Sequence, residues 1–271
     1  MKNFNPEHTV QKIREEMRGY VKENGLKSLV VGLSGGIDSA LVAALAAPVC
    51  RELGVPLIGR FIHIESNKPD EGSRADAVGS AFCADYKSVD LTDLYHVTRQ
   101  TVEEDGSADL AELRHRIRLG NVKARLRMIY LYNLAQKFGG LVLSTDNYTE
   151  FLLGFWTLHG DVGDYGPIAE LWKTEVYECA KWLADRELAS TDRQRALQRC
   201  VDAVPTDGLG TTGSDLDQLR AATYAEVDSL LQRYLSGERS QPLTEHPVIQ
   251  RHLRSAYKRN NPHNVARERV V

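Results

Sequence analysis

The sequence lacks several features that would point to other classes of protein. Its four cysteines, Cys50, Cys83, Cys179 and Cys200, form no CxxC pair and no Cys/His zinc pattern, so we expect reduced thiols in a cytoplasmic protein. No window approaches the roughly 18 apolar residues of a membrane span, and the polar N-terminus does not resemble a signal peptide. A net charge of −3 provides no overall basic surface for duplex nucleic acid.

The residues that are present indicate a globular α/β protein. Hydrophobic residues make up 42% of the 271 positions, which is enough for a substantial core. Runs of β-branched residues alternate with helical periodicity, as in a parallel α/β sheet. Predicted strands cover 28–33, 56–64, 87–91 and 140–146. Predicted helices cover 10–21, a stretch from 37 onward, 70–86, 108–138 with a candidate break at Gly120, a stretch from about 169, 215–234 and 245–258.

These elements predict a doubly wound parallel sheet, because crossovers between parallel strands are right-handed. Ligands then bind beyond the C-terminal ends of the strands, where the loops after the first and fourth strands would meet. We expect one domain over residues 1–271, with a helical C-terminal part. The segment 202–215 is rich in Gly, Pro, Thr and Asp, so we interpret it as a loop and a candidate lid.

The stretch "VVGLSGGIDSALVAALA", residues 30–46, places a glycine-rich turn between a strand and a helix. Backbone N–H groups at a helix N-terminus bind phosphate, glycine allows a close approach, and the hydroxyls of Ser34 and Ser39 can add donors. The turn contains neither GxxxxGK[ST] nor GxGxxG, so it is neither a P-loop nor a dinucleotide-binding turn. It predicts a different phosphate cradle.

Two other interpretations of this turn are weaker. Residues Gly32–Gly36 satisfy the GxSxG pattern of serine hydrolases, but in that fold an oxyanion loop and an earlier strand precede the nucleophile, whereas a mostly helical stretch precedes Ser34. A structural turn without a ligand would not explain why Asp38 completes an SGGxDS pattern one turn into the helix.

The motif "SGGIDS" resembles the pyrophosphate-binding loop of the N-type ATP pyrophosphatases. The segments "GNVKARLRM", "STDNYTE", "GFWTLHGDVGDYGPIAELWKTEV", "VPTDG" and "YKRNNP" follow in the order found in ammonia-dependent NAD synthetases, and the likeness extends from Gly32 to Pro262. This resemblance implies an adenine nucleotide alpha hydrolase-like fold and a homodimer. It also implies amidation of deamido-NAD by ATP and ammonia through an acyl-adenylate, with release of AMP and pyrophosphate. No glutaminase domain is visible in the sequence, so free ammonia or a separate partner would supply the nitrogen.

The resemblance also implies roles for individual residues, with Asp38 and Lys173 as the catalytic pair. ATP would contact Gly32, Leu33, Ser34, Gly35, Gly36, Ile37, Asp38, Ser39, Thr145, Lys173 and Thr206. Mg²⁺ would bind Asp38 and Glu150, since carboxylate oxygens suit this ion. Deamido-NAD would contact Arg125, Asp164, Tyr257 and Lys258, with Asp161 as a further member of the same loop.

The sequence departs from the family pattern on the side of the acid substrate. Leu158 replaces the lysine of the familiar "FTKYGD" segment, Tyr257 replaces a frequent histidine, and 60–72 differs from the usual "RLPYG" segment. Two alternatives therefore stay open. One is an ATP pyrophosphatase that adenylates another carboxylic acid or a tRNA base, and the other is a nucleotide-binding protein without turnover.

Overall fold

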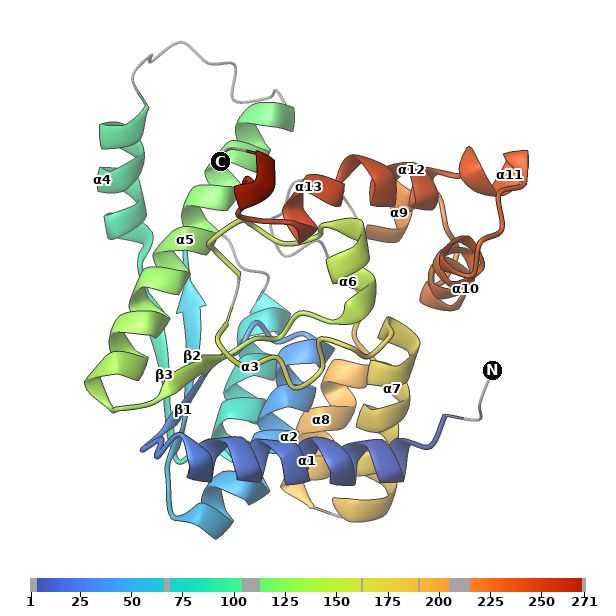
Figure 1. Ribbon diagram of the computed structural model, residues 1–271. Coiled ribbons are helices and arrows are strands. Elements are labelled where there is room, and N and C mark those ends of the chain that lie inside the picture. Colours follow the sequence, from blue (N-terminus) through green and yellow to red (C-terminus); the bar gives the residue numbers. More distant parts are fainter. Residues whose placement is uncertain are drawn as a thin grey trace.

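The strands of the protein form a four-stranded parallel sheet, which lies towards the left of Figure 1. The computed structural model describes residues 4–65, 69–103, 113–161, 163–189, 191–204 and 215–269. In this part of the chain the strands run in the order β3-β2-β1-β4. Their bounds are β1 Leu29–Gly32, β2 Leu57–His63, β3 Asp85–Asp90 and β4 Leu141–Leu143. The order reverses direction between β1 and β4, which creates a crevice at the C-terminal ends of these two strands.

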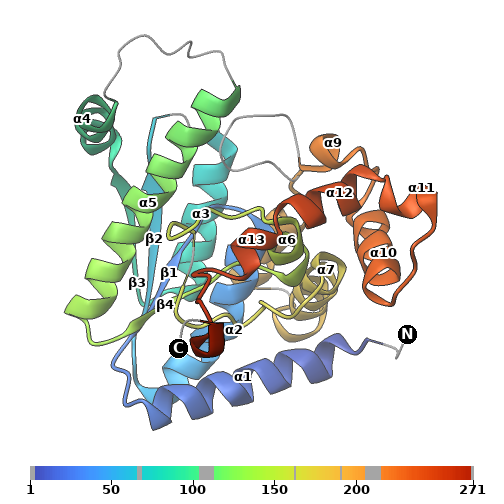
Figure 2. The same cartoon turned by 45° about the horizontal axis from the view of Figure 1, so that its top comes forward.

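Helices cover both faces of the sheet and form a separate group at the C-terminal end of the chain (Figures 1 and 2). The α-helices are α1 Pro6–Glu23, α2 Ile37–Leu53, α3 Pro69–Phe82, α4 Thr92–Val102, α5 Leu113–Lys137, α6 Tyr148–Leu153, α7 Lys173–Trp182, α8 Asp192–Val201, α9 Asp215–Leu219, α10 Tyr224–Leu235, α11 Gln241–Thr244, α12 Pro247–Arg254 and α13 Ala256–Arg259. A π-helical turn, η1 Leu183–Glu187, extends α7, and a short 3₁₀ turn, η2, covers Arg267–Arg269. Among the described helices, none combines the length and the apolar character needed to cross a bilayer.

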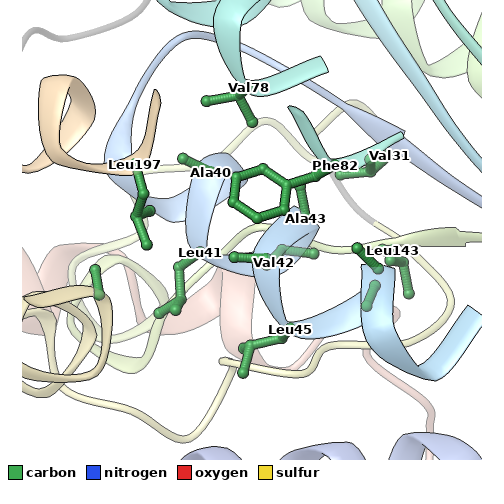
Figure 3. Close-up of a cluster of buried hydrophobic side chains, with 14 of the residues drawn as sticks. Val31, Ala40, Leu41, Val42, Ala43, Leu45, Val78, Phe82, Leu143 and Leu197 are labelled. Carbon is green, nitrogen blue, oxygen red and sulfur yellow. The ribbon is translucent and has the colours of Figure 1, made fainter. Parts of the chain in front are cut away.

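Alternate residues of the strands pack into different cores, as the period of two in a strand requires. Val31 and Leu143 point towards α2, whose alanine-rich sequence allows close packing on every side (Figure 3). Val30 and Val142 point to the opposite face, where α5 covers them. Both faces of the sheet are thus buried, which confirms the doubly wound α/β fold.

A second hydrophobic cluster forms what we call the helical lobe, made of α6 and α9 to α13. Its core includes Leu153 of α6, Val227 and Leu231 of α10, and Val248 and Ile249 of α12. The lobe contacts the sheet part through α10 and α7. This arrangement confirms the predicted helical C-terminal part.

Several predicted boundaries were wrong. Helix α5 continues through Gly120, because packing against β1 and β4 offsets the ~1 kcal/mol that glycine costs inside a helix. Helix α3 ends at Phe82. Tyr86 belongs instead to β3, where it pairs with Gly59 of β2. The region 215–234 is broken at Arg220, whose φ is 49°, and 245–258 divides into separate helices. Helix α7 begins at Lys173 rather than near Ala169. Helices α4, α6 and α8 were not predicted, although Ala196, Leu197, Cys200 and Val201 of α8 are buried at helical spacing.

Candidate active site

The loop that joins β1 to α2 has the shape expected of a phosphate cradle. Gly35 has a φ of 80°, and a Cβ at this position would lie 2.2 Å from the backbone oxygen of Glu71, so only glycine fits here. The Ser39 hydroxyl accepts the Ser34 N–H at 3.2 Å and donates to the Gly36 carbonyl at 3.1 Å. The Ser34 hydroxyl accepts the Gly36 N–H at 3.2 Å. Both hydroxyls therefore hold the loop in place at the N-terminus of α2.

The loop after β4 meets this cradle through Asn147. The Asn147 side-chain oxygen accepts the Glu150 N–H at 3.0 Å and so caps α6, which is the usual role of asparagine at this position. Its side-chain N–H donates to Asp38 Oδ1 at 2.9 Å. One fully buried amide thus ties the start of α6 to the start of α2. Sequence reasoning missed Asn147, because the helix that it caps, α6, was not predicted.

Lys173 lies between the two carboxylates that the sequence predicted as metal ligands. Its Nζ is 2.5 Å from Asp38 Oδ2 and 2.9 Å from Glu150 Oε1. The Lys173 side chain is only 5% exposed and each carboxylate 18% exposed, so solvent screens this ion-pair cluster weakly. Residues far apart in the sequence therefore form one charged centre in the crevice between β1 and β4.

Burial and charge act in opposite directions on this centre. Burial, with a contribution from the charge of Asp38, raises the pKa of Glu150 to about 7, although Lys173 counteracts it. Burial opposes the charge of Lys173, but the two carboxylates outweigh burial and raise the pKa of Lys173 well above its usual value. Burial also raises the pKa of Asp146 well above its usual value, with the charges of Glu150 and Asp161 adding to the shift. A cluster of shifted groups in a crevice is typical of a functional site.

The charged centre lines a cavity of about 800 Å³, a volume typical of ligand sites. Most of the predicted site residues line it, and these are Gly32, Leu33, Ser34, Gly36, Ile37, Asp38, Ser39, Thr145, Glu150, Asp161, Lys173, Tyr257 and Lys258. The cavity therefore joins the phosphate cradle to the C-terminal helix α13.

Three predicted residues lie elsewhere. Gly35 shapes the loop without lining the cavity. Arg125 is exposed and donates to the Leu158 carbonyl at 3.2 Å. Asp164 is also exposed and accepts hydrogen bonds from the Tyr132 hydroxyl and the Val142 N–H, both at 3.1 Å. The structure does not bring Arg125 or Asp164 to the cavity, so their contact with substrate stays a prediction. Thr206 and most of the candidate lid fall outside the described residues.

Arg127 lines the cavity although the sequence pointed to Arg125. Its Nε donates to the Ile62 carbonyl at 3.1 Å, and burial lowers the pKa of its guanidinium. The cavity-facing residues of α5 include Ile117, Asn121, Met128 and Leu131, which recur at helical spacing. Arg125 and Arg127 lie on opposite sides of that stripe at similar angles, so helical periodicity alone does not select Arg127.

Lys258 reaches the cavity from α13 and contacts the loop that follows α6. Its Nζ donates to the Gly154 carbonyl at 2.7 Å and to the Trp156 carbonyl. Burial, together with the nearby charge of Arg251, lowers the pKa of Lys258. Tyr257 beside it is 66% exposed. Lys258 therefore fixes the loop near the predicted acid substrate, whereas most of the Tyr257 side chain faces solvent.

Comparisons with known proteins show the family to which this chain belongs. A family model described as NAD synthase matches residues 9–262. The NH(3)-dependent NAD(+) synthetase of Methanococcoides burtonii is 36% identical over 79% of this chain and 74% of its own length. That of Archaeoglobus fulgidus is 32% identical over 96% of each chain. The solved structure of NMN synthetase from Francisella tularensis superposes with a TM-score of 0.77 and 26% identity, covering 97% of this chain and 98% of the other. The chain therefore belongs to the NAD synthase family.

Proposed function

We propose that this chain is a ligase that converts deamido-NAD to NAD with ATP and ammonia. The observation that carries the proposal is that the buried ammonium of Lys173 lies between Asp38 and Glu150. Asp38 belongs to the first turn of α2, where the phosphate cradle is. This arrangement suits the transfer of an adenylyl group, in which negative charge grows on both the attacking and the leaving oxygens. The relatives are named for ammonia-dependent NAD synthesis, and the resemblance implies ATP and deamido-NAD as the other substrates.

The chemistry proceeds in two displacements. A carboxylate oxygen of the substrate attacks the α-phosphorus of ATP, and the bond from that phosphorus to the bridging oxygen of pyrophosphate breaks. Ammonia then attacks the acyl carbon, loses a proton, and AMP leaves with the acyl oxygen. The N–H groups at the start of α2 hold the leaving pyrophosphate, and the ammonium of Lys173 offsets its charge.

Family members generally use a divalent metal, and we propose Mg²⁺ at Asp38 and Glu150. Among the described residues, no group of three or more His, Cys, Asp or Glu side chains could hold a metal. Two carboxylates completed by phosphates and water are instead the usual way in which Mg²⁺ binds beside a nucleotide. When bound, such an ion neutralises charge on the phosphates.

The acid substrate is tested with a pyrophosphate-release assay on a panel of acids with ammonium chloride. We expect release with deamido-NAD, with AMP and NAD as products. Nicotinic acid mononucleotide belongs in the panel, since it would yield NMN, and the Francisella tularensis relative is named for NMN synthesis. If the enzyme prefers that acid, another acid or a tRNA base, then that compound and not deamido-NAD is the substrate. Tight ATP binding without pyrophosphate exchange would indicate a protein without turnover. Release of ADP and phosphate would contradict the mechanism.

The remaining expectations belong to the same proposal. We propose that residues 1–271 act as one synthetase domain in the cytoplasm, that two copies form a homodimer, and that ammonia arrives free or from a separate partner. Light scattering of the purified protein tests the dimer. Activity with ammonium chloride but not with glutamine tests the nitrogen source.

A further inference from the structure

Asp228 is a buried carboxylate outside the motifs that suggested the function. It lies on α10 in the helical lobe and is only 2% exposed. Its Oδ1 accepts the Thr149 hydroxyl at 2.6 Å. Its Oδ2 accepts the N–H and the hydroxyl of Thr174, at 3.0 and 2.8 Å. A buried carboxylate is costly unless its oxygens accept hydrogen bonds. All three donors to Asp228 belong to residues that directly neighbour Glu150 or Lys173 in the sequence.

These hydrogen bonds reach Lys173 through its backbone. The Thr149 hydroxyl oxygen accepts the Lys173 N–H at 2.9 Å while its hydrogen is donated to Asp228. Lys173 and Thr174 begin α7, and the first N–H groups of a helix have no acceptor within the helix. Asp228 and Thr149 supply those acceptors, so they fix the turn from which the Lys173 side chain extends to Asp38 and Glu150.

The same face of α10 also contacts the other end of Lys173. Tyr224 lies one helical turn before Asp228, on the same side of the helix. The Lys173 Nζ is 5.4 Å from the centre of the Tyr224 ring, within the range of a cation–π interaction. The helical lobe therefore contacts both the backbone and the ammonium of Lys173, whereas the sheet part supplies Asp38.

We propose that Asp228 is a positioning residue for the reaction, which fixes Lys173 through Thr149 and Thr174. The inference rests on the proposed function, because it assigns the charge of Lys173 to the phosphates of ATP. It implies that the helical lobe is part of the catalytic machinery even where it does not touch ATP.

The first experiment compares Asp228→Asn with Thr149→Val and Thr149→Ser, measuring kcat for pyrophosphate release and the Kd for Mg-ATP. Asn keeps the shape but leaves one of the three donors unpaired, and Val removes the hydroxyl that Ser retains. We expect Asp228→Asn and Thr149→Val to lower kcat about tenfold, as the loss of a buried hydrogen bond would. Thr149→Ser should stay close to the wild type. Thr101→Val, which removes an exposed hydroxyl on α4, is the control.

A second experiment separates positioning from a merely structural role. In a double-mutant cycle, Asp228→Asn should weaken Mg-ATP binding in the wild type and have no further effect on Kd in Lys173→Ala. Equal effects in both backgrounds, or a lower melting temperature with unchanged kcat and Kd, would overturn the inference. If Asp228→Asn does not fold, equal activity of the Thr149→Ser and Thr149→Val variants overturns it instead. A wild type that neither binds ATP nor releases pyrophosphate contradicts the proposed function itself.

Discussion

The predicted site residues fall into two groups that are held in different ways. Of the phosphate-side residues, Lys173 is buried, Asp38 and Glu150 are each only 18% exposed, and Lys173 contacts both carboxylates. Of the acid-side residues, Arg125, Asp164 and Tyr257 are exposed, and only Lys258 is partly buried. Largely buried, mutually bonded groups are in place before a ligand arrives, whereas exposed side chains must be ordered when it binds. We therefore expect changes on the phosphate side to affect turnover most, and changes on the acid side to affect substrate affinity.

The largest expected effect comes from removing divalent metal. Treatment with EDTA followed by its removal should abolish pyrophosphate release. Without a divalent ion at Asp38 and Glu150, Lys173 alone would offset the negative charge of the phosphates. Adding back Mg²⁺ should restore the activity, and Ca²⁺ serves as a comparison. Full activity of the metal-free enzyme would show that the reaction does not need a metal at Asp38 and Glu150.

Asp38→Asn and Glu150→Gln come next. Each should lower kcat by about 100- to 1,000-fold, the size of effect seen when one preorganised electrostatic group is lost. The melting temperature should change far less, since each variant leaves Lys173 one carboxylate partner. Asp192→Asn, at an exposed surface carboxylate, is the control. If neither variant alters the kinetics, the metal assignment fails.

Gly35→Ala tests whether the loop needs its shape. The new methyl group would meet the backbone of Glu71 at a left-handed φ, so the cradle must move, and we expect loss of measurable Mg-ATP binding by titration. Gly25→Ala is the matched control, because Gly25 has a φ of 60° but nothing within 4 Å of the added carbon. It should cost only about 1 kcal/mol of unfolding free energy. Equal ATP affinity in both variants would show that the clash is harmless.

The contrast between the two groups also explains what could be predicted from the sequence. The motif SGGIDS is contiguous, so one pattern located the loop, the helix and Asp38 together. Strands β1 and β2 were equally visible, since both of their faces are buried. Asn147, Arg127 and Asp228 were missed because their importance depends on contacts with distant segments, such as the 2.9 Å bond from Asn147 to Asp38. No local pattern encodes such contacts.

Lys258→Ala should have a moderate effect on the acid side. Losing its bonds to the Gly154 and Trp156 carbonyls frees the loop beside the cavity and removes a positive charge. We expect KM for deamido-NAD to rise about tenfold, equivalent to about 1.4 kcal/mol, with KM for ATP unchanged. Lys137→Ala, at the exposed end of α5, is the control. If only KM for ATP changes, Lys258 contributes to the phosphate side and not to the acid side.

Arg125→Ala gives the smallest expected effect and the sharpest test of the acid side. Because Arg125 is exposed and bonded to the Leu158 carbonyl, solvent replaces much of what the substitution removes. We expect KM for deamido-NAD to rise only about threefold, corresponding to less than 1 kcal/mol, with kcat unchanged. Arg116→Ala, at another exposed arginine on the same helix, should change neither constant. If Arg125→Ala behaves like Arg116→Ala, Arg125 is a surface residue, and the acid substrate is recognised by groups that line the cavity, with Arg127 the first to examine.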